Sequence, residues 1–170
     1  MGPTNAYTAI EYDAVTTSDV FRVKPLYYGM WAVASAIANG AVMVVANVST
    51  SSPLLKAYAL RTSTTPHDSS NLSLSWRVVL LHKDVNATGV ARACVQLPAA
   101  QVGHSAVVWR LQAPSPWATT GITWAGQSFD GSTDGWPVGP VKNESVTRDP
   151  HTQCFNFDVS PGSVVLFEYR

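Results

Sequence analysis

The sequence is short of charged residues, and the two signs of charge balance. Charged side chains make up 13% of the 170 residues, and 11 Lys+Arg offset 11 Asp+Glu, so the formal net charge is zero. A nucleic-acid-binding protein needs a basic stripe that neutralises phosphates, and a protein held on a membrane surface by charge needs a basic cluster. The composition therefore argues against both classes. Hydrophobic residues, at 46% with six Trp, indicate a globular chain.

Cysteine is equally scarce. Cys94 and Cys154 are the two cysteines of the chain, and 60 positions separate them. They either form one disulfide or remain two buried thiols, because buried cysteines without a function are common.

The first residues lack the features of a secretion signal. The stretch "MGPTNAYTAIEYD" has neither a basic start nor an apolar run. Against this stand four N-x-[ST] glycosylation acceptors, which favour a secreted or lumenal protein. A secreted protein would then have its true N-terminus upstream of Met1. The four acceptors are Asn47, Asn71, Asn86 and Asn143.

No motif for a metal or a catalytic centre stands out. The four histidines are scattered, and His82 with Asp84 supplies two ligands at most. "GHSA" at 103–106 lacks the G-x-S-x-G nucleophile elbow. Glu11 and Glu144 are candidates for a glycosidase acid pair, but nothing in the sequence places them together. We expect no catalytic residue, no metal and no cofactor in this chain.

One segment has the spacing of a helix. Residues 21–41, "FRVKPLYYGMWAVASAIANGA", place a broad apolar stripe along one face. Pro25 suits the first helical position, and Asn39-Gly40 suits the end. The opposite face is small and uncharged, so we expect the helix to bury more than one face. The stripe is made of Leu26, Met30, Val33 and Ile37, and the opposite face of Tyr28, Gly29, Ala32, Ser35, Ala36 and Asn39.

The same region is too short and too interrupted for a membrane span. Residues 29–45 number 17, at the lower limit for crossing a bilayer, and Asn39-Gly40 falls inside them. We therefore expect no membrane span.

The rest of the chain has the period and punctuation of short strands. About eight runs rich in β-branched and aromatic residues follow the helix, separated by turn signals such as "NATG" and "SPGS". No helices lie between them, so an antiparallel sandwich is predicted rather than a parallel sheet. A further strand is predicted before the helix, at 6–12. The predicted later strands are 41–48, 54–61, 72–81, 90–97, 106–111, 121–124, 154–159 and 163–169.

Tryptophans in loop-rich sequence raise a second possibility. Trp117, Trp124 and Trp136 lie among turn residues, and exposed tryptophans in a β-sandwich are typical of carbohydrate binding. Core packing is the usual role of large aromatic rings, so both readings stay open here.

Several stretches, taken in order, resemble glycoside hydrolase family 79, the β-glucuronidase and heparanase-like family. "VKPLYYGMWAVASAIANGA" resembles the last barrel helix and the crossover that follows it. Resemblance to the family's C-terminal β-domain continues through "LKAYALR", "WRVVLLHKD", "GITWAGQSFDGSTDGWPVGP" and "FDVSPGSVVLFEY".

The resemblance implies two parts. Residues 1–40 would be the last βα unit of a (β/α)₈ barrel, and 41–170 the C-terminal β-sandwich that buttresses it. The two catalytic glutamates of the family belong to earlier barrel strands, so none is carried over to this chain. A sugar-contacting tyrosine after the last strand corresponds to Tyr7 in "NAYTAI", with Tyr12 as second choice.

The leading hypothesis is thus an accessory β-sandwich region of a family 79 β-glucuronidase-like enzyme, inactive alone. Its partner would be the catalytic barrel, and glucuronide-containing carbohydrate would reach it through the parent enzyme. A free-standing carbohydrate-binding module and a structural or adhesion domain are the alternatives. Since the barrel is missing here, we expect Tyr28, Gly29 and Ala32 to be unusually exposed to solvent.

Overall fold

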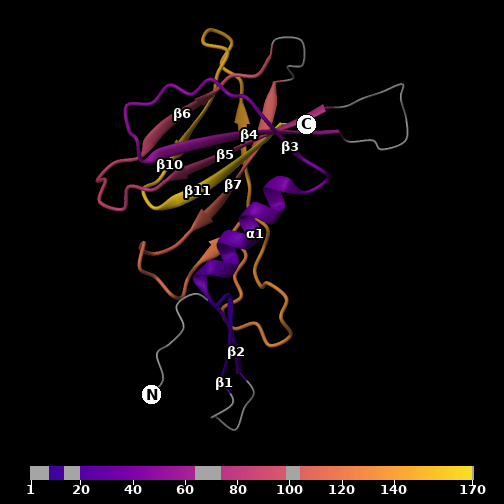
Figure 1. Ribbon diagram of the computed structural model, residues 1–170, viewed down its shortest axis with the longest axis vertical. Helices are drawn as coiled ribbons and strands as arrows, with labels where there is room; N and C mark the ends of the chain where they lie inside the picture. The colour runs from indigo at the N-terminus through magenta and orange to yellow at the C-terminus, as the bar shows by residue number, and fades with distance from the viewer. Residues whose placement is uncertain (1–7, 14–19, 64–73, 99–103, 170) are drawn as a thin grey trace.

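The computed structural model describes residues 8–13, 20–63, 74–98 and 104–169, and every structural statement below concerns these residues. They form 11 strands and one helix (Figure 1). In chain order these are β1 (Ile10–Asp13), β2 (Val20–Val23), α1 (Pro25–Ile37), β3 (Val42–Val44), β4 (Leu55–Ser63), β5 (Leu74–His82), β6 (Ala91–Val95), β7 (Ser105–Gln112), β8 (Thr123–Trp124), β9 (Glu144–Thr147), β10 (Phe155–Val159) and β11 (Ser163–Tyr169).

The described strands pair antiparallel throughout, in three sheets. A seven-stranded sheet has the order β3-β4-β5-β11-β7-β8, with β9 also paired to β7. β6 and β10 form a two-stranded sheet, and β1 and β2 form a hairpin ahead of the helix. The prediction of a mainly β, antiparallel sandwich is confirmed.

The main core lies between the seven-stranded sheet and the β6–β10 pair. Phe155 and Val159 of β10 and Val165 and Phe167 of β11 are fully buried in it. Phe157 and Phe167 stack, with ring centroids 5.8 Å apart. Because side chains alternate along a strand, the neighbours of these β11 residues project to the opposite face of the sheet. That opposite face receives α1, so the domain has three layers.

Helix α1 is shorter than the predicted 21–41. Val20–Val23 form β2, paired with β1, so the first residues of the predicted helix belong to a strand. Pro25 opens the helix, as predicted, because its fixed φ suits the first turn. The helix ends at Ile37, and Asn39 and Gly40 follow with φ of 62° and 66°. These two residues end the helix where the sequence indicated.

The expectation about the faces of α1 is wrong. Tyr28 and Ala32, predicted to be exposed, are 1% and 5% exposed, and Gly29 is half-buried. Tyr28, Ala32 and Ala36 pack on the sheet, in a cluster that includes Trp124 and Leu166. The physical reason is size: the sheet supplies large side chains on this face, so Ala32 and Ala36 allow close approach, while the ring of Tyr28 packs against Phe129. The exposed face of the helix is instead its large apolar stripe.

Most predicted strands are present, and two observed strands were not predicted. The eight strand runs after the helix correspond to β3, β4, β5, β6, β7, β8, β10 and β11. β2 was assigned to the helix, and no strand was predicted at the position of β9, "ESVT". Within the residues described, no helix has the length and apolarity needed to cross a bilayer.

Cys94 and Cys154 form a disulfide that joins β6 to the residue before β10. Their Cα atoms lie 5.1 Å apart, and the bond closes a loop with a sequence separation of 60. A turn aligns Cys154: the N–H of Asp149 donates to its carbonyl oxygen at 2.8 Å. The bond therefore fixes the smaller sheet at the end where that turn enters β10.

Reducing this disulfide should destabilise the domain. A Cys94→Ser/Cys154→Ser variant should lose about 2–4 kcal/mol in free energy of unfolding, because the unfolded chain regains the entropy of a long loop. Urea denaturation of the variant and of the oxidised wild type measures the difference. Wild type in reducing agent should match the variant, and equal midpoints for reduced and oxidised protein would contradict the prediction.

Candidate functional site

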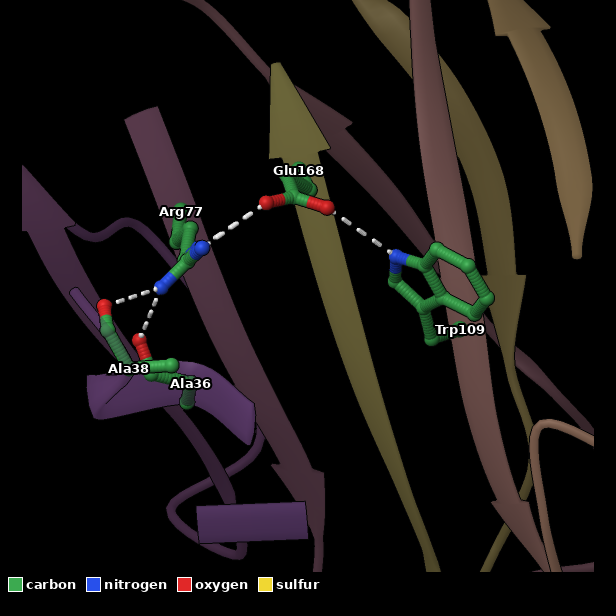
Figure 2. A network of polar contacts seen from close by, with 5 residues as sticks. All are labelled: Ala36, Ala38, Arg77, Trp109 and Glu168. Carbon is green, nitrogen blue, oxygen red and sulfur yellow. Dashed lines mark hydrogen bonds and ion pairs between the residues drawn. The ribbon is translucent and has the colours of Figure 1, made fainter. Parts of the chain in front are cut away.

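The last turn of α1 is held by an arginine from the sheet. A helix leaves its final carbonyl groups without partners, and α1 has no basic residue of its own in that turn. Arg77 of β5 fills this role (Figure 2). Its Nη1 donates to the carbonyl oxygens of Ala36 at 3.0 Å and Ala38 at 2.7 Å. The cation also suits the negative end of the helix dipole.

The same guanidinium pairs with Glu168 of β11, the neighbouring strand. Arg77 Nε and Nη2 donate to Glu168 Oε1 at 3.1 and 2.9 Å. Trp109 Nε1, on β7, donates to the other carboxylate oxygen at 3.3 Å. The side chains of Arg77 and Glu168 are only 7% and 6% exposed. One buried ion pair thus connects three adjacent strands with the end of the helix.

A cavity of about 230 Å³ lies beside this ion pair, between α1 and the sheet. Trp31 and Ser35 line it from the helix, and Trp109 and Trp124 from the sheet. Arg77 and Glu168 also reach it, but their charges already pair with each other. The cavity is therefore part of the helix–sheet interface.

The first turns of α1 are packed by a loop of the sandwich. Phe129, in the segment between β8 and β9, meets the rings of Tyr27 at 5.1 Å, Tyr28 at 5.7 Å and Trp31 at 5.4 Å between centroids. The N–H of Phe129 donates to Tyr28 Oη at 2.7 Å, and that oxygen lies 3.0 Å from Ser128 Oγ. Both ends of the helix are thus attached to the β-domain.

The outward face of α1 is an apolar surface without a covering layer in the described residues. Its four stripe residues, Leu26, Met30, Val33 and Ile37, are 45–57% exposed. The chain continues from them into β3, an edge strand of the large sheet, where exposed side chains persist. These are Val42 and Met43 of β3, and Val45 and Val48 in the segment that follows it. Apolar side chains gathered in this way are typical of a surface that another element covers.

The predicted sugar-contacting tyrosines fall where little is described. Tyr7 lies outside the described residues, and Tyr12 lies in β1, where its backbone pairs with Phe21 but its side chain is not described. Asn71 also lies outside the described residues. The other three glycosylation acceptors, Asn47, Asn86 and Asn143, are exposed.

The three loop tryptophans divide into two groups. Trp117 and Trp136 are 82% and 74% exposed. Trp124 is 4% exposed and belongs to β8, where it packs under α1, so core packing, one of the two readings left open by the sequence, holds for this residue. The strand predicted at 121–124 is observed as β8, with two residues.

The ion pair was not predicted from sequence, although a signal existed. Arg77 is the one charge inside "LSWRVVLL", and Glu168 is the one charge inside "SVVLFEY". A lone charge in an apolar strand run indicates a buried charge, which requires a partner of opposite sign. The sequence could not show that these two strands are neighbours.

The described residues contain no group of three or more His, Cys, Asp or Glu side chains that could hold a metal ion. Asp149, in the turn before β10, has its pKa lowered, mainly because the backbone N–H of His151 donates to its carboxylate at 2.8 Å. This hydrogen bond shapes the turn and lies apart from the helix.

The comparisons with known proteins agree with this architecture. The model of the family described as "Glycosyl hydrolase family 79 C-terminal beta domain" matches residues 57–166. The chain belongs to this family. The matched stretch begins in β4 and ends in β11 at residue 166, so it contains Arg77 and stops just before Glu168.

Two solved structures are similar to this family 79 domain. A 4-O-α-L-rhamnosyl-β-D-glucuronidase from Fusarium oxysporum 12S is 18% identical with a TM-score of 0.57, over 84% of this chain and 29% of that chain. An α-L-arabinofuranosidase from Thermotoga maritima is 14% identical with a TM-score of 0.42, over 69% of this chain and 19% of that chain. The chain thus spans less than a third of either structure. No curated protein sequence matches it.

Removing Arg77 should destabilise the domain strongly. Arg77→Met leaves the Glu168 carboxylate buried without its cation and frees two helix carbonyls, so a loss of about 3–5 kcal/mol in free energy of unfolding is expected. Urea denaturation measures it. Replacing both charges, in Arg77→Met/Glu168→Leu, should recover part of the loss because no unpaired charge remains.

A surface ion pair gives the matched control. Arg92 and Asp158 lie 3.5 Å apart with side chains 71% and 48% exposed. Arg92→Ala should cost less than about 1 kcal/mol because water screens the pair. Equal effects of the two arginine substitutions would contradict a structural role for Arg77.

Proposed function

We propose that this chain is the C-terminal β-sandwich region of a β-glucuronidase-like family 79 glycoside hydrolase, and that it buttresses a catalytic (β/α)₈ barrel. One observation carries the proposal: α1 packs one face on the sheet and leaves a second, larger apolar face bare. A barrel on that face would make α1 a helix shared by two domains. Leu26, Met30, Val33 and Ile37 would become part of the interface.

The division of the chain follows from the same proposal. Residues 1–40 are the end of the barrel, finishing with α1, and 41–170 are the accessory sandwich. The crossover between them leads directly into edge strand β3, whose exposed Val42 and Met43 extend the surface offered to the barrel. We expect the sandwich and the barrel to stay firmly associated, because burying apolar surface stabilises an interface by roughly 25 cal/mol per Å².

The substrate and the setting are also proposals. Glucuronide-containing carbohydrate is the proposed substrate of the parent enzyme, with Tyr7 touching the sugar and Tyr12 as second choice. The catalytic glutamate pair is proposed to lie in the barrel. The proposed location is secreted or lumenal, which agrees with the exposure of Asn47, Asn86 and Asn143 and with the disulfide, a bond that persists in oxidising compartments.

A free-standing carbohydrate-binding module is the second candidate. The exposure of Trp117 and Trp136 favours it, since an indole face in solvent can stack on a sugar ring. Such a module would need no second domain, and the bare face of α1 would then have no partner. The experiments below separate the two.

Activity should require residues upstream of Met1. The 170-residue chain alone should give no turnover of an aryl β-glucuronide. A polypeptide extended by the preceding coding sequence should hydrolyse it, because that part would supply both glutamates. Release of the aryl group measures the rate. Turnover by the isolated chain, or none by the extended protein, would overturn the proposal.

The bare stripe should behave differently with and without the barrel. In the isolated chain, Met30→Gln/Val33→Gln should lower the binding of a hydrophobic dye and self-association, with little change in stability, because both side chains face water. In the extended protein the same variant should lower the thermal midpoint, because the two residues would be buried there.

Ala32 supplies the control on the same helix. It faces the sheet and is 5% exposed, so Ala32→Gln should destabilise both forms. A stripe variant that leaves the extended protein as stable as wild type would show that the barrel does not rest on α1.

A further inference from the structure

We infer that the loop between β8 and β9 forms one wall of the parent enzyme's saccharide cleft, and that Trp136 on this loop stacks on a sugar ring. The ring would lie on the leaving-group side, beyond the unit attached to the cleaved bond. This inference rests on the proposed function, because it requires α1 to be the last helix of the barrel. It assigns a binding role to the accessory domain, which the proposal above treats only as a support.

The direction of α1 identifies the relevant end of the domain. In a (β/α)₈ barrel the active site lies at the carboxyl ends of the strands, which is the end where the helices begin. Helix α1 begins at Pro25 and is preceded by the β1–β2 hairpin, whose Ala9 carbonyl accepts the Lys24 N–H at 2.9 Å. The Pro25 end therefore marks the catalytic face. In Figure 1 this is the lower end of α1, where the hairpin extends away from the sandwich.

The β8–β9 loop is attached to that same end. Phe129 packs against the rings of Tyr27 and Trp31, on the first two turns of α1. Tyr28, 1% exposed, accepts the Phe129 N–H through its hydroxyl oxygen. A side chain on the barrel helix thus holds the loop backbone, so the loop and the catalytic end of α1 keep a fixed relation.

The loop is also ordered by its own hydrogen bonds. Ser128 and Val138 exchange two backbone hydrogen bonds, at 3.0 and 2.7 Å, which close the base of the loop. Asp130 accepts the N–H of Gly121 from the preceding loop, and Asp134 accepts the N–H of Trp136 at 3.1 Å. Trp136 thus lies in a loop whose conformation is fixed by hydrogen bonds, and its side chain is 74% exposed.

The chemistry of this position fits a sugar. A large apolar ring in water is costly unless it has a partner, and an indole face matches the apolar face of a pyranose. Asp130 and Asp134 on the same loop add carboxylate oxygens that can accept hydrogen bonds from hydroxyl groups. The carboxylates of Asp130 and Asp134 would repel the carboxylate of a sugar acid. The ring over Trp136 is therefore expected to be an uncharged sugar rather than another glucuronic acid.

The test uses the full enzyme, with its barrel, and two substrates. One is a short aryl β-glucuronide that ends one ring after the cleaved bond. The other is a β-glucuronide whose leaving group is a chain of three or more neutral sugars. Trp136→Ala should raise KM for the long substrate by roughly 5- to 10-fold, with kcat unchanged, because a stacking contact is lost in the ground state and transition state alike. KM for the short substrate should stay within twofold.

Two further variants serve as controls for Trp136→Ala. Trp136→Tyr should keep most of the affinity for the long substrate, because it restores an aromatic face. Trp117→Ala removes a similarly exposed indole from the loop between β7 and β8, which the inference does not place in the cleft, and it should leave both substrates unaffected. An unchanged KM for the long substrate in Trp136→Ala, or an equal effect on both substrates, would overturn the inference.

The outcomes also separate this inference from the proposed function. If wild-type enzyme cleaves the short glucuronide but Trp136→Ala behaves like wild type on the long one, the inferred role of the loop as a cleft wall is wrong, and the proposed accessory role is unaffected. If wild-type enzyme cleaves neither glucuronide, the proposed function is wrong, and the inference about the loop, which depends on it, is wrong as well.

Discussion

The buried pair between Arg77 and Glu168 is the interaction on which the arrangement of layers depends. It lies on the face of the seven-stranded sheet that is turned away from the main core, where unpaired charges would be costly. Glu168 uses one oxygen for Arg77 and the other for Trp109, while Arg77 uses its remaining nitrogen, Nη1, for two carbonyls at the end of α1. The polar groups of the strands and of the helix end thus supply one another's hydrogen-bond partners. A purely apolar interface would hold α1 equally well but would not specify where along the sheet it ends.

The two faces of α1 follow from what each has to meet. The sheet presents large rings, so the helix turns Ala32 and Ala36 inward and lies close to them. The larger residues of the stripe remain for a second neighbour, whose surface they can fill. A helix with one small and one large apolar face is suited to a position between two domains. This is the arrangement expected of a last barrel helix beside its accessory domain, and it makes α1 the shared element of the proposed enzyme.

The two ends of α1 are held by different interactions, and this difference bears on the proposed function. At Ile37 the helix is held by charge, from Arg77, deep in the domain. At Pro25 it is held by aromatic packing from the Phe129 loop, close to the hairpin that precedes it. A loop from the sandwich therefore reaches the end of the helix at which a barrel carries out its chemistry. Under the proposed function, the accessory domain would contribute both to the support of the barrel and to the shape of its entrance.

Alternation, turn residues and the 3.6-residue period in this sequence were sufficient to predict an antiparallel β-domain with a helix within residues 21–41, with Pro25 at its first position and Asn39-Gly40 at its end. These features are local, so neighbouring residues reveal them. The residues also carried a resemblance that placed the chain in its family. The short strands β2 and β9 were missed, because four residues carry too weak a period to outweigh the signals around them. Only the tertiary structure decided which apolar face of α1 is covered, that Trp124 is buried, and that the lone charges at positions 77 and 168 meet. Each of these depends on contacts between segments far apart in the chain, and the spacing of residues along a sequence holds no record of which segments become neighbours.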